Sequence, residues 1–458
     1  MISFDLVSAL TAALPAGVKI IPAGEGTAAY DKDESGLGRF PPQAVVLARD
    51  VADVQATMRF SHQHKIPVVP RGGGSGKSGG ALAEKGGVVL SLEKLDKILE
   101  IHPADGVCVV EPGVVLENLQ KAVEAQGLFY PPDPNSQQWC TIGGNLAHNA
   151  GGPRALKYGV TRDWVMGCEA VLPDGTLIRC GHRSWKGVAG YDLTQLLVGS
   201  EGTLAVITQA TLKLIPLPRR AETMIAFFPD EEHAAAGVQA IFNAGLLPRA
   251  CELLDGVVMR AVSPRSPFKF PGDVGGAVII EFDGNSDAVT DELVQAGEKC
   301  TEAGAIDVVA AQDEAQRRRI WETRRMISVA LTDLRPFKIS EDVCVPRGSL
   351  IAMIRAVTRI GEKNGIATAN YGHAGDGNLH VNLLFKTAEE RAANLHAVDE
   401  VMAAALSFGG TITGEHGVGA AKRAFLPREQ APEVIALQKR LKAAFDPEGL
   451  LNPGKIFP

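Results

Sequence analysis

A strict alternation of polar and apolar side chains marks one segment in the last quarter of the chain. Residues 378–383 read Asn-Leu-His-Val-Asn-Leu, and this period of two predicts a half-buried β-strand with one polar face. The turn residues Gly375–Gly377 precede it and would fold the chain back. His373 could then converge with His380 and make half of a metal site. A polar hairpin in solvent is the alternative.

Apolar spacing in the first half predicts short elements separated by glycine-rich breaks. Asp50 can cap an amphipathic helix that ends near Lys65. Extended segments are predicted at Pro67–Pro70 and Val88–Leu92, and the Asp-Gly pair at 174–175 predicts a β-hairpin.

The loop between those two extended segments is rich in glycine. Six of the ten residues 71–80 are glycine, so successive backbone N–H groups can face an anion with no Cβ in the way. The loop lacks the spacing of a P-loop, and a strand follows it where the dinucleotide-binding fingerprint requires a helix. A flexible surface loop is the alternative for this element alone.

In the second half, strand and helix patterns alternate. The predicted strands are 224–228, 250–254, 277–282 and 306–310, and the predicted helices are 231–243, 290–303 and, near the end of the chain, 432–444. Alternation of this kind predicts an α+β domain built on an antiparallel sheet.

Composition narrows the class of protein. A length of 458 residues predicts two or three domains, and 45% apolar with 22% charged residues is ordinary for a soluble protein. The net charge of −7 argues against nucleic acid as a partner. We expect no secretory signal, no transmembrane segment of roughly 18 residues and a cytoplasmic protein. The seven scattered cysteines form no Cys-x-x-Cys pair, which predicts reduced thiols and no iron–sulfur cluster within this chain.

Two further glycine-rich segments follow the first. They are Thr141–Pro153, after the proline-rich Tyr130–Pro134, and Gly199–Leu204. Three such clusters in this order closely resemble the FAD-binding domain of the vanillyl-alcohol oxidase and p-cresol methylhydroxylase flavoproteins. Within that superfamily, the chain from about Phe40 onward resembles the FAD subunit of glycolate oxidase and the FAD-linked D-lactate and D-2-hydroxyglutarate dehydrogenases.

The resemblance implies an α+β fold class with three parts. A two-part FAD-binding domain of p-cresol methylhydroxylase type would occupy 1–217. An α+β substrate cap with an antiparallel sheet would occupy 218–410, and a helical C-terminal segment at 411–458 would return to the FAD-binding domain. A homodimer is left open.

The resemblance also implies which residues bind FAD. Backbone N–H groups of Arg71–Gly76 would hold the pyrophosphate. Glu201, Gly202 and Ile207 would lie near the adenine half. Some relatives attach the flavin covalently through a histidine at the place of Ser75, so we expect non-covalent FAD here. His148 replaces an expected glutamate; it is interpreted as a surface substitution, with contact to the flavin as the alternative. The full predicted set is Pro70, Arg71, Gly72, Gly73, Gly74, Ser75, Gly76, Pro132, Asp133, Thr141, Gly143, Gly144, Asn145, Asn149, Gly151, Gly152, Glu201, Gly202, Ile207 and Asn452.

A cluster of arginines at 317–325 is usually a solvated helix face. In the relatives, however, an arginine three residues after a tryptophan grips the substrate carboxylate, and Arg324 has that spacing from Trp321. Lys338 matches an assisting lysine. A guanidinium binds a carboxylate in a bidentate fork and an ammonium adds a point charge. Ser328 would share a helical face with Arg324 and could bind substrate or lie at the surface.

Glu415, in the motif Gly414–Gly419, completes a set of two histidines and one carboxylate with His373 and His380. Such a set leaves open metal positions for substrate. It resembles the metal-dependent branch of the superfamily, which implies a divalent metal; zinc is expected, with manganese or iron as alternatives.

The chemistry that this resemblance implies is oxidation at C2 of a D-2-hydroxy acid. The acid would chelate the metal, which lowers the pKa of the hydroxyl, and His416 would take the proton as general base. Hydride would pass from C2 to flavin N5. Arg324 and Lys338 would fix the acid, and Asn378 would steady either the acid or the flavin.

Substrate and acceptor are less closely specified. D-lactate or glycolate is expected, and D-2-hydroxyglutarate is the alternative. A non-catalytic flavin subunit of a hydroxy-acid oxidase complex is a second class, and an aryl-alcohol or ether-lipid enzyme a third. Electrons would pass to an electron-transferring flavoprotein, an iron–sulfur subunit or quinone, in a complex that could be peripheral to the inner face of the membrane.

Overall fold

The computed structural model describes residues 5–267, 269–272 and 274–458. The chain forms two compact units: unit 1 is Met1–Gly151, Val160–Leu217 and Glu415–Pro458, and unit 2 is Gly152–Gly159 and Pro218–Gly414. The division at Leu217 is where the sequence places it. Unit 2 runs four residues beyond the predicted cap and also includes Gly152–Gly159, which the sequence analysis left in the FAD-binding domain.

Unit 1 begins with a small mixed sheet. Its strands, in spatial order, are β1 (Lys19–Pro22), β2 (Ala44–Leu47), β4 (Val88–Ser91) and β3 (Val68–Arg71). β4 pairs in parallel with both β2 and β3, and β1 pairs antiparallel with β2. Two helices, α1 (Leu6–Ala13) and α2 (Val51–His64), pack on an apolar core with this sheet. As predicted, Asp50 caps α2 by accepting from Asp53 N at 3.0 Å.

A second, antiparallel sheet completes unit 1. Its strands, in spatial order, are β5 (Ile98–His102), β6 (Val107–Val110), β10 (Val206–Lys213), β8 (Val165–Val171) and β9 (Leu177–Gly181). The predicted hairpin turn joins β8 to β9, with Gly175 at φ +86°. The remaining elements of the unit are α3 (Leu116–Glu124), β7 (Leu128–Phe129), α4 (Ile142–His148), η2 (Thr161–Trp164), α6 (Leu193–Leu197), β11 (Ile215–Pro216), η1 (Glu25–Thr27), α15 (Leu426–Glu429) and α16 (Pro432–Phe445).

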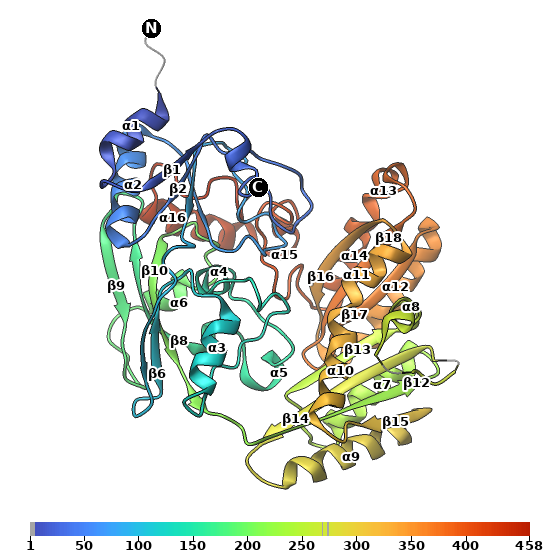
Figure 1. Ribbon diagram of the computed structural model, residues 1–458. Coiled ribbons are helices and arrows are strands. Elements are labelled where there is room, and N and C mark those ends of the chain that lie inside the picture. Colours follow the sequence, from blue (N-terminus) through green and yellow to red (C-terminus); the bar gives the residue numbers. More distant parts are fainter. Residues whose placement is uncertain (1–4, 268, 273) are drawn as a thin grey trace. The chain divides into compact units, whose positions relative to one another are not determined.

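The C-terminal segment returns to the first sheet of unit 1. Figure 1 shows α15 and α16 in red among the blue and green elements of the same unit. Leu451 forms a parallel bridge to Val68, and Asn452 N donates to the Val68 carbonyl at 2.7 Å. Asp446 fixes this return because its carboxylate accepts from Leu450 N, Leu451 N and the Lys442 ammonium.

Unit 2 is built on one antiparallel sheet. Its described strands, in spatial order, are β15 (Asp307–Ala310), β12 (Arg220–Phe228), β14 (Gly276–Gly284), β13 (Ala250–Asp255), β17 (Ala367–His373), β18 (Asn378–Phe385) and β16 (Phe337–Cys344). The helices are α5 (Ala155–Tyr158), α7 (Glu231–Asn243), α8 (Gly256–Val262), α9 (Ala288–Glu302), α10 (Glu314–Arg325), α11 (Ile327–Leu334), α12 (Leu350–Asn364), α13 (Ala388–Ala393) and α14 (His396–Ser407), with η3 (Ser263–Arg265) and η4 (Arg347–Ser349).

Helices cover both faces of this sheet. One face presents Ile225, Leu254 and Leu384 to the helices α8, α10 and α11. Residues of opposite parity face the other way: Met224 lies beside α9, and Phe228 lies against Gly237 of α7. Unit 2 is therefore a three-layer α/β/α sandwich (Figure 1).

The expectation of a half-buried β18 is wrong. Every residue of β18 is buried, including Asn378, His380 and Asn382. Their parity is that of Leu384, which belongs to the core beneath α8, α10 and α11. The polar residues therefore share one side of the sheet with part of an apolar core, and both faces of β18 are buried within the unit.

We predict that Asp446→Ala destabilises unit 1 by about 3 kcal/mol, because the substitution leaves two backbone N–H groups without their acceptor and removes the counter-charge of the partly buried Lys442 ammonium. Urea unfolding followed by fluorescence measures this loss.

Glu448→Ala is the matched control. Glu448 lies two residues further on and makes only an exposed ion pair with Lys65, so stability should change little. Equal midpoints for the Asp446→Ala variant and the unmutated protein would contradict the role given to Asp446.

Candidate active-site residues

The glycine loop of unit 1 lies directly against the second glycine cluster. A Cβ at Gly72 would collide with Thr141 Oγ1, and a Cβ at Gly73 would collide with the Trp139 carbonyl oxygen. Gly74 has φ +69°, a left-handed conformation that glycine adopts most easily. The two clusters therefore form one backbone-lined surface, because side chains are excluded where they meet.

The second cluster forms the start of α4. Thr141 is the N-cap residue, and its Oγ1 accepts from Gly144 N at 3.4 Å. Gly143 must be glycine, since a Cβ there would collide with Pro112. The predicted FAD-binding residues Thr141, Gly143, Gly144 and Asn145 are thus placed together at one helix end.

Several buried polar atoms along these segments have no hydrogen-bond partner among the described residues. They include Arg71 Nη1, Ser78 Oγ, His148 Nδ1 and Asn452 Oδ1. Burial lowers the pKa of the Arg71 guanidinium, against the opposing charges of Asp33, Tyr30, Asp31 and Glu93. Buried polar groups are normally paired, so the set fits a bound polar molecule such as FAD.

His148 is not the surface substitution that the sequence analysis expected. It ends α4 and is half-buried, with its ring beside Gly76, Gly80 and Gly417. The reason is that α4 packs between the first glycine loop and the segment that follows His416.

Glu201 binds the segment that follows His416. Its backbone has φ +52°, and its carboxylate accepts from Val418 N at 2.8 Å and from Gly419 N at 2.7 Å. These bonds fix the turn that begins at His416, whose Nε2 lies 3.9 Å from Glu415 Oε1. The carboxylate predicted to lie near adenine is thus a support of the His416 turn.

Two predicted asparagines also serve the fold. Asn149 Oδ1 accepts from Arg162 N at 2.8 Å. Asn452 Nδ2 donates to the carbonyls of Gly80 at 2.9 Å and Glu201 at 2.8 Å. The other predicted FAD-binding residues of unit 1 lie in β3 (Pro70), the glycine loop (Ser75, Gly76), the segment before α4 (Pro132, Asp133), the segment after it (Gly151), the turn before β10 (Gly202) and β10 (Ile207), while Gly152 opens the short segment of unit 2.

In unit 2 the chain brings His373 and His380 together. His373 ends β17 and His380 lies in β18. Their ring centroids are 5.4 Å apart, and a ring nitrogen of His373 lies within 4.8 Å of a ring nitrogen of His380. They are 6% and 7% exposed. The turn that the glycines predicted is confirmed: Gly377 N donates to the Ala374 carbonyl at 3.3 Å, and Gly377 has φ +85°.

Glu252, which the sequence analysis missed, joins this pair. It is completely buried in β13; its Oε1 lies 2.5 Å from His373 Nδ1, and its Oε2 accepts from Arg324 Nε at 2.5 Å. Burial alone would raise the pKa of the Glu252 carboxyl, but the charges of His373 and Arg324 lower it to about 2. A lone glutamate within the apolar run Ala-Cys-Glu-Leu-Leu was the available signal.

Arg324 is buried and does not belong to a solvated helix face. Its guanidinium carbon lies 4.8 Å from the centroid of the Tyr371 ring, which lies 5.2 Å from the ring centroid of His380. Arg324 and the two histidines therefore share one buried cluster with Tyr371 and Glu252.

Lys338 and Ser328 have a different arrangement from the predicted one. The helix that carries Arg324 ends at Arg325 and a new helix starts at Ile327, so Ser328 does not continue the face of Arg324. Instead, Lys338 Nζ donates to the Ser328 carbonyl and to Oγ, both at 2.8 Å. Lys338 pairs with Leu384, four residues from His380 along β18, or roughly 13 Å.

Asn378 fixes the end of unit 2. Its Nδ2 donates to Asp342 Oδ1 at 2.6 Å and to the Val343 carbonyl at 3.0 Å, while its buried Oδ1 has no partner among the described residues. Asp342 Oδ2 also accepts from Thr413 Oγ1 at 2.9 Å. A Cβ at Gly414 would collide with Asn378 Nδ2, so this glycine allows the chain to pass closely just before Glu415.

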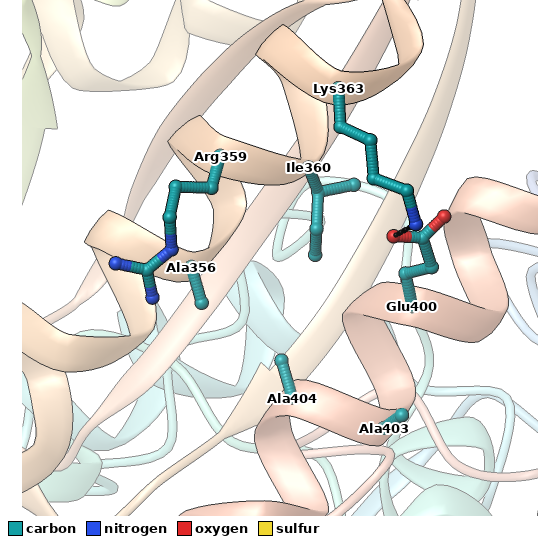
Figure 2. Close-up of a pocket in the computed structure, with 7 residues that line it drawn as sticks. All are labelled: Ala356, Arg359, Ile360, Lys363, Glu400, Ala403 and Ala404. Carbon is teal, nitrogen blue, oxygen red and sulfur yellow. Dashed lines mark hydrogen bonds and ion pairs between the residues drawn. The ribbon is translucent and has the colours of Figure 1, made fainter.

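A groove between α12 and α14 carries no comparable chemistry. Figure 2 shows that Ala356, Ile360, Ala403 and Ala404 line it, with the Lys363–Glu400 ion pair at one side. That pair, at 2.9 Å, joins an exposed lysine to a half-buried glutamate. The groove contains none of the predicted site residues.

Two family models match the chain. The model described as "FAD binding domain" matches residues 42–181, and the model described as "FAD linked oxidases, C-terminal domain" matches residues 217–456. The second alone spans more than half of the sequence.

Curated relatives match over nearly their whole length. Glycolate oxidase subunit GlcD of Bacillus subtilis is 39% identical, over 94% of this chain and 92% of its own. D-lactate dehydrogenase of Anaerostipes hadrus is 36% identical (93% and 92%), and D-2-hydroxyglutarate dehydrogenase of Stutzerimonas stutzeri is 34% identical (96% and 96%).

Among solved structures, p-cresol methylhydroxylase with substrate bound is similar with a TM-score of 0.79, over 98% of this chain and 96% of its own, at 17% identity. That likeness establishes the mixed α and β fold of the p-cresol methylhydroxylase type. None of the helices in the described part of the chain has the length and apolar character that crossing a bilayer requires.

We predict that Glu201→Ala loosens the His416 turn. Loss of an ionised acceptor for two backbone N–H groups should lower the local opening free energy by about 2 kcal/mol, so exchange at these amides should accelerate about thirtyfold. Hydrogen–deuterium exchange of the peptide that contains Val418 and Gly419 measures it.

Asp192→Ala is the control, because the Asp192 carboxylate accepts from Gln195 N elsewhere in unit 1. That variant should leave the exchange of Val418 and Gly419 unchanged. Unchanged exchange in the Glu201→Ala protein would show that another contact holds the turn.

Proposed function

The chain belongs to the FAD-linked oxidase family, and from that premise we propose that it oxidises a D-2-hydroxy acid, D-lactate or glycolate, to the 2-oxo acid. Its relatives named glycolate oxidase subunit and D-lactate dehydrogenase match over nearly the full chain. Their names describe substrates that share one feature, a hydroxyl group beside a carboxylate.

The observation that carries the proposal is the buried cluster of His373, His380 and Arg324 in unit 2. With Glu415, the two histidines make a group of ligands that could hold a metal ion. Two imidazoles and one carboxylate suit zinc, manganese or iron, and zinc is the metal that we propose. A guanidinium in the same cluster as the metal ligands suits a substrate whose carboxylate lies next to its reacting hydroxyl.

The cofactor requirement is met by unit 1. Its glycine-lined backbone surface and its buried polar atoms without partners suit non-covalent FAD. When bound, FAD supplies a hydride acceptor and the metal supplies a Lewis acid that polarises the hydroxyl.

The protein residues then bind the acid and move its proton. Arg324 anchors the carboxylate, and Lys338, held by Ser328, is its proposed second cation. Asn378 offers its buried Oδ1 as an acceptor toward the acid or the flavin. His416, on the turn fixed by Glu201, takes the hydroxyl proton as general base.

D-2-hydroxyglutarate is the second candidate substrate, because a dehydrogenase of that name is 34% identical over 96% of the chain. Its second carboxylate would need a further basic contact, for which Arg325 is the proposed residue. The remaining alternative is that the chain is a non-catalytic flavin subunit. The protein acts in the cytoplasm and passes electrons to a separate acceptor: an electron-transferring flavoprotein, an iron–sulfur subunit or quinone.

We predict that His380→Ala lowers kcat for D-lactate by roughly a thousandfold, since loss of one ligand removes several kcal/mol of metal-derived stabilisation. FAD should stay bound, because His380 belongs to unit 2. Dye-linked turnover and flavin absorbance measure both quantities.

The exposed His396 of α14 supplies the control, and His396→Ala should keep full activity. Full turnover of D-lactate by the His380→Ala protein would reject the metal-assisted reaction.

Removal of metal makes a separate prediction. Dialysis against a strong chelator should abolish turnover while the flavin spectrum persists, and stoichiometric Zn²⁺ or Mn²⁺ should restore it. Activity that survives with less than about one-tenth of the metal retained would contradict the proposal.

A further inference from the structure

The buried glutamate Glu252 contacts both kinds of residue on which the proposed function depends. One carboxylate oxygen lies 2.5 Å from Nδ1 of His373, a metal-ligand candidate, and the other accepts from Nε of Arg324, the candidate carboxylate anchor. The contacts join three elements of unit 2: β13, β17 and α10. No role in metal or substrate binding follows for Glu252 from the sequence motifs.

The contact with His373 determines which ring nitrogen can bind a metal. A carboxylate accepts, so Nδ1 carries the hydrogen; in the neutral imidazole, the form that binds a metal, Nε2 then keeps its lone pair. Histidine ligands of metals commonly donate their other N–H to a carboxylate, which fixes the tautomer and the ring orientation. Glu252 occupies that position toward His373.

The contact with Arg324 uses Nε, the guanidinium nitrogen nearest the aliphatic stem. This bond restricts rotation of the guanidinium plane, as does its place over the Tyr371 ring. One buried carboxylate therefore restrains the orientation of both neighbours.

We propose that Glu252 is a positioning residue that holds the His373 ring and the Arg324 guanidinium as one assembly. The metal ligand and the substrate anchor then keep a constant separation, matched to a hydroxyl and a carboxylate on adjacent carbons. This inference rests on the proposed function of the same site and adds to it the residue that aligns its two halves.

A neighbouring glutamate shows what a purely structural buried carboxylate looks like in the same sheet. Glu281 of β14 is also buried and accepts from Arg249, Arg317 and the Trp321 indole N–H. Among the described residues, no histidine forms a hydrogen bond with Glu281. A buried ion pair adds little net stability. The contact with a histidine is therefore the feature that distinguishes Glu252 from Glu281 and to which we assign its role.

The test measures Zn²⁺ affinity of the full-length FAD-loaded protein after metal removal, in competition with a chromophoric chelator. Glu252→Gln keeps the side-chain shape but removes the charge and one acceptor. We expect its Zn²⁺ dissociation constant to rise about ten- to a hundredfold and its KM for D-lactate to rise as Arg324 loses its support. FAD content should stay equal to that of the unmutated protein.

Glu281→Gln is the matched control. It removes a buried charge from the next strand, so we expect a lower melting temperature but Zn²⁺ affinity within twofold of the unmutated protein. Glu252→Asp, which keeps the charge on a shorter side chain, should recover part of the Zn²⁺ affinity that Glu252→Gln loses.

A second measurement needs no variant. Nitrogen-15 NMR of histidine-labelled, metal-free protein should show His373 as the tautomer protonated at Nδ1. The opposite tautomer would overturn the inference even if every Glu252 variant failed to fold.

The outcomes separate the inference from the function on which it rests. If the unmutated protein binds no Zn²⁺, the proposed metal-assisted function fails. If it binds Zn²⁺ and turns over D-lactate, but Glu252→Gln matches it in affinity and KM, only the role of Glu252 is overturned.

Discussion

The buried polar cluster of unit 2 depends on one carboxylate, whose two oxygens each contact a different polar side chain. Ionised groups lose hydration when buried, and the loss is offset only when each charge has a partner and good hydrogen bonds. Glu252 meets this condition through His373 and Arg324. Without it, a guanidinium and an imidazole would both be buried without that shared carboxylate partner.

Unit 1 follows a complementary principle, in which missing side chains allow the backbone to approach. Gly72 and Gly73 let the first loop touch the Trp139–Gly144 segment, and Gly417 leaves room for His148 and Glu201. Glu201 restrains the His416 turn through two hydrogen bonds, as Glu252 restrains the His373 ring. In unit 2 the acidic side chain contacts the histidine itself, and in unit 1 it bonds to the backbone of the turn that follows the histidine.

Local signals in the sequence predict much of this architecture. The cap at Asp50 and the Asp-Gly turn before β9 place helix and strand ends within a few residues. The alternation at 378–383 predicts β18 correctly, but burial of its polar face depends on helices far away in the chain. Local pattern reports the period of an element and leaves open what covers it.

The residues whose surroundings were not predicted correctly depend on contacts that a local sequence pattern does not report. Glu252 finds its partners 72 and 121 residues further along, so no nearby motif could reveal it. The helix break at Met326 has no glycine or proline to mark it, and so Ser328 was assigned to the face of Arg324. His148 is a polar residue at a helix end, a position that is commonly exposed. Its ring is half-buried only because α4 packs against two glycine-rich segments.

One measurement tests most directly whether the buried cluster and FAD act on a D-2-hydroxy acid. The purified protein is mixed anaerobically with D-lactate, L-lactate, glycolate and D-2-hydroxyglutarate, and flavin absorbance near 450 nm is followed in a stopped-flow instrument. We expect rapid bleaching by D-lactate or glycolate, none by L-lactate, and loss of the bleaching after metal removal. Bleaching by L-lactate alone, or equal bleaching without metal, would contradict it.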